Sequence, residues 1–212
     1  RPVSSAASDV YKRQLPHQRS GVRWLLARRG AVLADEMGLG KTLTALLAAR
    51  AMIRCVEMRL MVVAPVGLHP HWRRESDALD LRIDLVSWAK LPDGLPEAGT
   101  VLLVDEAHYA QSLTAQRTRA LLRLARHPRL RAIWMLTGTP MKNGRPSQLY
   151  PLLAAIDHPI ARDQQDFEER YCQGHWQEGR TEALAGGGSQ PARGIATTDA
   201  SIDPASTQSS GG

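Results

Sequence analysis

A glycine-rich turn between an apolar strand and an apolar helix constrains the fold of this chain more than any other feature. The apolar run at residues 31–34 is typical of a strand, and the run at residues 41–54, rich in Ala and Leu, is typical of a helix. The turn between them contains Gly38 and Gly40. Because glycine has no Cβ, the backbone there can direct successive N–H groups toward phosphate oxygens, which the start of the following helix also attracts. The turn therefore predicts a nucleotide-phosphate site in an α/β protein.

The side chains of the turn indicate how such a site would work. Lys41 would reach the β- and γ-phosphates of ATP, and the Thr42 hydroxyl would ligate Mg²⁺. However, the phosphate-loop pattern G-x-x-x-x-G-K-[ST] asks for glycine at the position of Asp35. A turn that only caps an ordinary helix is therefore the alternative on this stretch alone. The residues expected to bind the nucleotide here are Met37, Gly38, Leu39, Gly40, Lys41 and Thr42.

A second motif, "TVLLVDEAH" at residues 100–108, supports the nucleotide interpretation. Its unbroken apolar run, residues 101–104, is typical of a strand buried on both faces of a parallel sheet. Open α/β sheets bind ligands at the carboxyl ends of their strands. Asp105 is therefore expected to hold Mg²⁺, directly or through water, and Glu106 to orient and deprotonate the attacking water. A solvated strand end is the alternative for an isolated Asp-Glu pair.

A third stretch, "IWMLTGTP" at residues 133–140, again ends an apolar strand in a small polar turn. The hydroxyls of Thr137 and Thr139, on either side of Gly138, can hydrogen-bond to backbone groups or to neighbouring acids. We expect this turn to act as a relay between the nucleotide and another surface of the protein.

These stretches, taken in order with two others, resemble a known family. "LPHQRSGVRWL", "DEMGLGKT", "VVAPVGLHPHW", "DEAH" and "LTGTP" are similar to the first half of the motor of SWI/SNF-type DNA-dependent ATPases, in helicase superfamily two. That family has Asp in place of the first loop glycine, so Asp35 is a mark of the family. The similarity covers about residues 15–174, and "RTRALL", "PSQLYPLL" and "FEERYCQG" lean toward its annealing-helicase branch.

The resemblance implies roles for residues outside the three motifs. Gln18 matches the glutamine that reads the adenine edge, since a side-chain amide can pair with a donor and an acceptor together. Pro65 matches the motif that lies along the DNA backbone, with Trp72 in the helix behind it. Ser87 stands where the next DNA-contact motif is expected, although Trp88 replaces the usual tyrosine.

Two further positions bear on these roles. The family commonly has Lys-Asn near residues 111–112, where this chain has Gln-Ser, and that departure puts a DNA contact there in doubt. His69 and His71 lack Cys or acidic partners at ligand spacing, so no structural metal is expected.

The resemblance implies an α/β fold, a RecA-like lobe in which helices cover both faces of a parallel sheet. Strands are expected at residues 31–34, 60–64, 83–87, 100–104 and 132–136, and helices at 41–54, 71–79, 112–126 and 146–156. The implied function is that of the N-terminal lobe of an ATP-dependent double-stranded-DNA translocase, whose second lobe and arginine finger are missing. A DEAH-type RNA helicase lobe and a non-catalytic nucleotide-binding module are the alternatives.

Composition is consistent with a phosphate-bearing partner. The chain has 212 residues, with 27 Lys plus Arg against 21 Asp plus Glu, and a net charge of +6. A basic excess suits DNA, although a modest one is also typical of an ordinary solvated surface. Two cysteines indicate no disulfide framework, and no apolar run is long enough to span a membrane, so a cytoplasmic protein is expected, at the nucleoid if bacterial. The oligomeric state is not indicated.

The two ends of the chain differ in character from the middle. Residues 4–14, "SSAASDVYKRQ", match the translation of a transposase-type sequencing-library adapter, so we expect residues 1–14 to be an assembly artefact. Residues 181–212 are rich in Gly, Ser, Ala and Thr and have no periodic apolar face, which predicts a disordered or frameshifted tail. Residues 15–180 are left as the ATP-binding lobe.

Overall fold

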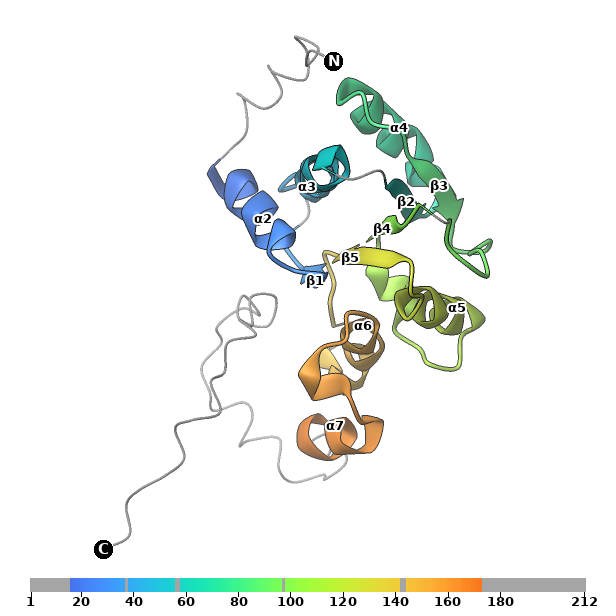
Figure 1. The fold of residues 1–212 in the computed structure, drawn as a ribbon. Coiled ribbons are helices and arrows are strands. Elements are labelled where there is room, and N and C mark those ends of the chain that lie inside the picture. The colour runs from blue at the N-terminus through green and yellow to red at the C-terminus, as the bar shows by residue number, and fades with distance from the viewer. Residues whose placement is uncertain (1–15, 37, 56–57, 97, 142–143, 173–212) are drawn as a thin grey trace, which may run out of the picture.

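A parallel sheet with helices on both faces forms the body of the protein. The structure is a computed structural model, and it describes residues 16–36, 38–55, 58–96, 98–141 and 144–172 (Figure 1). The expectations for residues 1–14 and 181–212 lie outside these residues. In the described part of the chain, no helix has both the length and the apolar character needed to cross a bilayer.

The sheet has five strands in the order β1-β5-β4-β2-β3, and every neighbouring pair is parallel. The strands are β1 (Gly30–Leu33), β2 (Arg59–Ala64), β3 (Asp84–Ser87), β4 (Thr100–Val104) and β5 (Leu130–Leu136). Each expected strand is confirmed, with small shifts at the ends. The carboxyl ends of all five strands meet along one edge of the sheet, which is where the sequence predicts the site.

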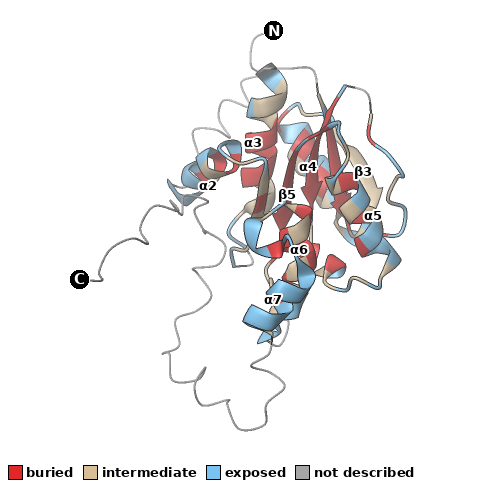
Figure 2. Ribbon diagram, turned by 60° about the horizontal axis from the view of Figure 1, so that its bottom comes forward, coloured by how far each residue is buried: buried red, intermediate tan, exposed pale blue. Residues whose placement is uncertain are grey.

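Side chains of β4 alternate between two apolar cores, as expected for a strand buried on both faces. Val101 and Leu103 belong to the core that packs against α2 (Pro16–Leu26), α3 (Lys41–Cys55) and α4 (His69–Ala78). Leu102 and Val104 belong to the core beneath α5 (Gln116–Ala125) and α6 (Tyr150–Ala155). All four are fully buried, and Figure 2 shows the strands buried between the two helical layers. The prediction of helices on both faces is confirmed.

Two of the expected helices differ from the structure at their ends. The helix expected over 112–126 begins only at Gln116, because Ala115 is extended and the hydroxyls of Ser112 and Thr114 pair with each other at 2.9 Å in the preceding turn. The helix expected over 146–156 is divided into a 3₁₀ turn, Pro146–Gln148, and α6.

The helix α7 (Gln164–Tyr171) has no counterpart among the helices expected from the sequence. The Asp163 carboxylate caps this helix by accepting a hydrogen bond from the Asp166 N–H at 2.9 Å. Phe167 is buried against Leu149 and Leu153 in a small third core. Because only one large apolar side chain of α7 is buried, its helical period is weak in the sequence.

Candidate functional site

The glycine-rich turn leads from the carboxyl end of β1 into α3. Gly38 and Gly40 have φ angles of 86° and 74°, in the left-handed region that favours glycine. A Cβ atom at Gly40 would collide with Nε2 of Gln18, whereas a Cβ at Gly38 would meet no atom within 4 Å. The φ angle of Gly40 therefore favours glycine, and a Cβ there would also require the end of the Gln18 side chain to move. Met37 lies outside the described residues.

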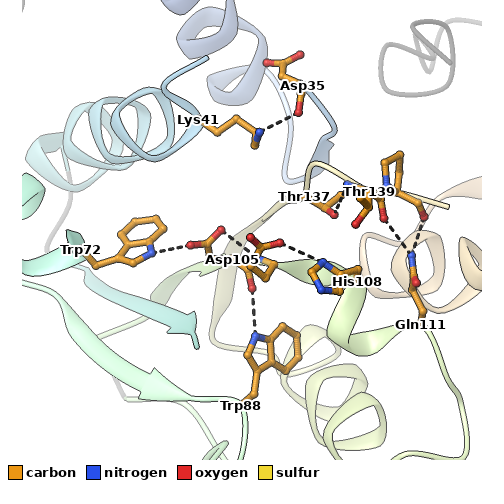
Figure 3. Close-up of polar contacts among 11 residues, drawn as sticks. Asp35, Lys41, Trp72, Trp88, Asp105, His108, Gln111, Thr137 and Thr139 are labelled. Carbon is orange, nitrogen blue, oxygen red and sulfur yellow. Dashed lines mark hydrogen bonds and ion pairs between the residues drawn. The ribbon is translucent and has the colours of Figure 1, made fainter. Parts of the chain in front are cut away.

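Lys41 is the first residue of α3, and its ammonium group folds back onto the turn. Nζ donates to the carbonyl oxygen of Asp35 at 2.8 Å (Figure 3). It also donates to the carbonyl oxygen of Glu36 at 2.8 Å. Its partners are therefore main-chain oxygens of the loop that it closes. The first N–H groups of a helix have no partner within that helix, so the start of α3 and the Lys41 ammonium present donors at the same place.

Gln18 lies on α2 and is 8% exposed. Its amide approaches Gly40, so the residue expected to read adenine and the turn expected to hold phosphates touch each other. The nearby His17 imidazole, at Nε2, is 3.2 Å from the carbonyl oxygen of Leu39. The structure thus brings α2 and the glycine-rich turn together, an arrangement that the sequence indicated only through the family resemblance.

Asp105 directly follows β4 and is held from several directions. Its N–H donates to the carbonyl of Val63 at 2.8 Å, which continues the ladder with β2. Its Oδ2 accepts from the indole N–H of Trp72 at 2.8 Å, and its Oδ1 accepts from the N–H of Glu106 at 2.9 Å. The indole N–H of Trp88 donates to its main-chain carbonyl at 3.1 Å (Figure 3). Both ends of this residue are therefore fixed.

Glu106 has left-handed backbone angles, φ 49° and ψ 50°, which are uncommon for a residue with a side chain. Such angles cost about 1 kcal/mol or more and concentrate at functional sites. One Glu106 carboxylate oxygen lies 3.0 Å from Nδ1 of His108. This distance suits an ion pair when the imidazole is protonated, although Nδ1 does not meet the geometry of a hydrogen bond. The His108 ring also stacks on Tyr109, with centroids 4.8 Å apart.

The turn after β5 is tied both to β1 and to the segment after the DEAH residues. The N–H of Thr137 donates to the carbonyl of Leu33 at 3.2 Å, and the buried Thr137 hydroxyl accepts from the N–H of Thr139 at 3.1 Å. The amide of Gln111 donates to the carbonyl of Pro140 at 2.8 Å and approaches that of Thr139 at 3.4 Å (Figure 3). Gly138, between the two threonines, is half-buried.

Three residues with a clear place at this site are not predicted from the sequence as contributors to it. Trp72 and Trp88 were considered only as parts of DNA-side motifs, and Gln111 only as a departure from the family pattern. No signal in the sequence identifies their hydrogen-bond partners, because each partner lies on a different strand or turn.

Pro65 directly follows β2, and Ser87 is the last residue of β3. Both strands lie on the side of β4 away from β5. Ala64 and Ser87 are partners in the register of β2 and β3, so both expected DNA-side residues lie at the same edge as Asp105. A hollow of about 910 Å³ opens beside Trp88 and Tyr109. Its other lining residues are Ala89, Leu91, Ala115, Gln116, Arg117, Arg119, Ala120 and Arg123.

The donor set at the strand ends is compatible with Mg²⁺. Among the described residues, no group of three or more His, Cys, Asp or Glu side chains is arranged to hold a metal ion. Mg²⁺ in nucleotide sites is usually bound by one or two protein oxygens, with phosphates and water as the remaining ligands. Asp105 and Thr42, both half-buried, can supply such oxygens.

Comparison with known sequences matches residues 17–81 and 96–185 to the SNF2-related domain. The chain is 29% identical over 195 residues to SWI/SNF-related matrix-associated actin-dependent regulator of chromatin subfamily A-like protein 1 of Xenopus tropicalis, covering 80% of this chain and 20% of that protein. It is 32% identical over 192 residues to DNA annealing helicase and endonuclease ZRANB3 of Mus musculus, covering 76% and 18%. The chain spans about a fifth of the length of these curated relatives.

Solved structures show the same fold. The SWI2/SNF2 ATPase core of Sulfolobus solfataricus, in complex with dsDNA, matches with a TM-score of 0.60 at 20% identity, covering 73% of this chain and 38% of that one. The UvsW helicase of bacteriophage T4 matches with a TM-score of 0.50 at 14% identity, covering 65% and 57%. The expected helicase-type lobe is confirmed as the fold.

Proposed function

Because the chain belongs to the SNF2-related domain family, we propose that it is the N-terminal ATP-binding lobe of an ATP-dependent double-stranded-DNA translocase. One observation carries this proposal. The loop after β1, the turn after β5 and the acids after β4 stand side by side at adjacent strand ends, in an order that the chain sequence alone does not produce. We place this lobe at residues 15–180.

The first loop is suited to binding the nucleotide. Lys41 can exchange its two carbonyl partners for phosphate oxygens without moving its backbone, because those partners belong to the rim of the same loop. The N–H groups at the start of α3 add further donors to the phosphates. Gln18, held against Gly40, is positioned for a base attached to those phosphates. Met37, Gly38 and Leu39 complete the loop in this proposal.

The DEAH segment supplies the groups for hydrolysis. Glu106 is the proposed base, and it would accept the proton of a water that attacks the γ-phosphate. Asp105 and Thr42 are the proposed protein ligands of Mg²⁺, which when bound neutralises charge on the phosphate oxygens. Thr137, Gly138 and Thr139 lie between the β1 and β4 ends and would sense which nucleotide is present.

Duplex DNA is the proposed partner of the other half of the edge, at Pro65 and Ser87. Arg117, Arg119 and Arg123 line the adjoining hollow, and positive side chains in a concavity suit a phosphate backbone. The names of two similar proteins support this choice, one a DNA annealing helicase and one a core in complex with dsDNA. These names also favour the annealing-helicase branch. A protein that acts on this substrate would be located with the DNA. In a bacterium, that location is the nucleoid in the cytoplasm.

In this proposal, hydrolysis also needs groups on the side of the nucleotide that faces away from this lobe. An arginine finger contributes roughly 10³–10⁵ in rate to phosphoryl transfer. We propose that a second lobe of the full-length protein supplies this arginine. This chain alone would then bind Mg-nucleotide weakly and hydrolyse it at a rate near background, with no response to DNA.

Phosphate release by the purified chain, with and without duplex DNA, tests this proposal. Lys41→Ala is the control for contaminating ATPases. Robust DNA-stimulated turnover that depends on Lys41 would contradict the half-site interpretation. In the full-length protein, stimulation by duplex RNA but not by duplex DNA would instead favour an RNA helicase.

A further inference from the structure

Two tryptophan side chains donate hydrogen bonds to Asp105 from the segments that follow β2 and β3, on the proposed DNA side. We propose that Trp72 and Trp88 are positioning residues, which fix Asp105 for Mg²⁺ and couple the segments after β2 and β3 to the metal end of the nucleotide site. This inference rests on the proposed function, since it concerns the same Asp105.

The geometry separates the two roles. Trp72, on α4, is fully buried and its N–H is 2.8 Å from Oδ2, so it sets the direction of the carboxylate. Trp88, just after β3, is 7% exposed and its N–H is 3.1 Å from the main-chain oxygen, so it holds the backbone. Together with the Glu106 N–H on Oδ1, they leave each carboxylate oxygen one further lone pair for a ligand.

The choice of acceptor is informative. A buried indole N–H almost always finds a partner, so a hydrogen bond by itself indicates only satisfied packing. Trp134 is equally buried, and its N–H donates to the carbonyl of Arg28 at 3.0 Å, on the side of the sheet where the strands begin. Trp72 instead donates to a carboxylate, the group expected to bind the metal. Groups that orient metal ligands typically contribute 10- to 100-fold to metal affinity.

The donors stand on elements that a DNA partner would contact. Pro65 leads through a short 3₁₀ turn, Val66–Leu68, into α4, and Ser87 immediately precedes Trp88. A small displacement of either segment therefore moves a donor of Asp105 directly, with no intervening side chain. This is a physical route by which DNA contact at one end of the edge would alter Mg²⁺ binding at the middle.

The test measures affinity for a fluorescent ATP analogue against Mg²⁺ concentration, using the full 212-residue chain. Trp72→Phe keeps most of the ring volume and removes the donor. We expect it to raise the Mg²⁺ concentration for half-maximal binding about tenfold, while the affinity in EDTA changes less than about twofold. Trp88→Phe should give a smaller shift in the same direction. Trp88→Tyr should shift the Mg²⁺ dependence no further than Trp88→Phe does. Trp134→Phe is the matched control, because it also removes a buried indole hydrogen bond, and it should give no shift.

A wild-type Mg²⁺ dependence in Trp72→Phe would overturn the proposal, and so would an equal shift in Trp134→Phe.

A second measurement keeps all tryptophans and needs no nucleotide. In ¹⁵N-labelled chain, Asp105→Asn should move the Trp72 indole resonance and leave that of Trp134 in place. An unmoved Trp72 resonance would also overturn the proposal. Absence of Mg²⁺-dependent nucleotide binding in the wild-type chain would count against the proposed function. The indole resonances would still decide whether Trp72 donates to Asp105.

Discussion

The glycine-rich turn after β1 and the turn at residues 105–106 after β4 lie at the same edge of the sheet, yet they are built in opposite ways. In the loop, the charged group of Lys41 binds main-chain oxygens of its own turn, and Leu39 is 41% exposed. In the DEAH turn, Asp105 is bound by side chains from two other elements. The contacts of Lys41 stay within its own turn, whereas Asp105 is held by side chains from elsewhere in the fold.

The difference indicates which part of the site moves when a ligand binds. A preorganised charged group needs no reorganisation during the reaction, and this is the usual source of electrostatic catalysis. If Lys41 binds phosphate as proposed, it has to give up two carbonyl contacts, so its net contribution to nucleotide affinity would be smaller than the new contact alone. We therefore expect loss of the Glu106 carboxylate to act mainly on rate and loss of the Lys41 ammonium to act mainly on nucleotide binding.

The largest effect is expected on the rate, from Glu106→Gln in the complete motor. The amide keeps the shape of the side chain but cannot accept the proton, so turnover should fall by roughly two or more orders of magnitude. Nucleotide affinity, measured by titration with a fluorescent ATP analogue, should stay near that of the wild type. Undiminished DNA-stimulated turnover would show that another residue acts as the base.

The next effect is expected on binding, from Lys41→Ala. Loss of a charge-assisted phosphate contact should weaken ATP affinity by about 2–3 kcal/mol in the isolated chain. Lys90→Ala removes the same charge from an exposed turn and should leave the affinity unchanged. If both variants bind ATP as tightly as the wild type, Lys41 does not hold the phosphates.

Within the loop, alanine substitutions of the two glycines separate the cost of backbone strain from the cost of a steric collision. Gly40→Ala places a Cβ at φ 74° and against the Gln18 amide, and we expect a loss of about 2 kcal/mol in the free energy of unfolding. Gly38→Ala places a Cβ at φ 86° in open space, so about 1 kcal/mol of backbone strain should be its whole cost. Urea unfolding of the two variants measures the difference. Equal losses would mean that Gln18 yields without cost.

The smallest effect is expected from Gln111→Ala. Its amide hydrogen bond to the carbonyl of Pro140 should contribute about 1 kcal/mol to stability. Gln164→Ala, which removes an exposed contact to Glu168 on α7, should change stability by less than about 0.5 kcal/mol. A Gln111 variant no less stable than the Gln164 variant would show that the turn after β5 does not depend on this link.

The sequence was sufficient for the features that depend on local pattern. Continuous apolar runs identified the strands, and Gly38, Gly40 and Lys41 identified the loop. The order β1-β5-β4-β2-β3 was not predicted, because periodicity carries no information on which strands pair. The hydrogen bonds of Trp72 and Trp88 to Asp105 were missed for the same reason. In the sequence these residues are apolar rings, and they become donors to one residue only when α4 and β3 are packed. Roles in ATP and DNA binding stay predictions.

The position of β1 in the sheet has a consequence for how the protein is made. In the described sheet β1 pairs with β5 alone, and Ala31 is opposite Trp134, about a hundred residues later in the chain. At a synthesis rate of about 5–20 residues per second, the strand that leads into the phosphate loop waits roughly 5–20 seconds for its partner. During that interval β2 and β3 can already pair, because they are close in sequence. The strand that leads into the glycine-rich turn therefore pairs only after β5 is made, and a ribosome that stalls before residue 130 leaves an unpaired apolar strand for chaperones to protect.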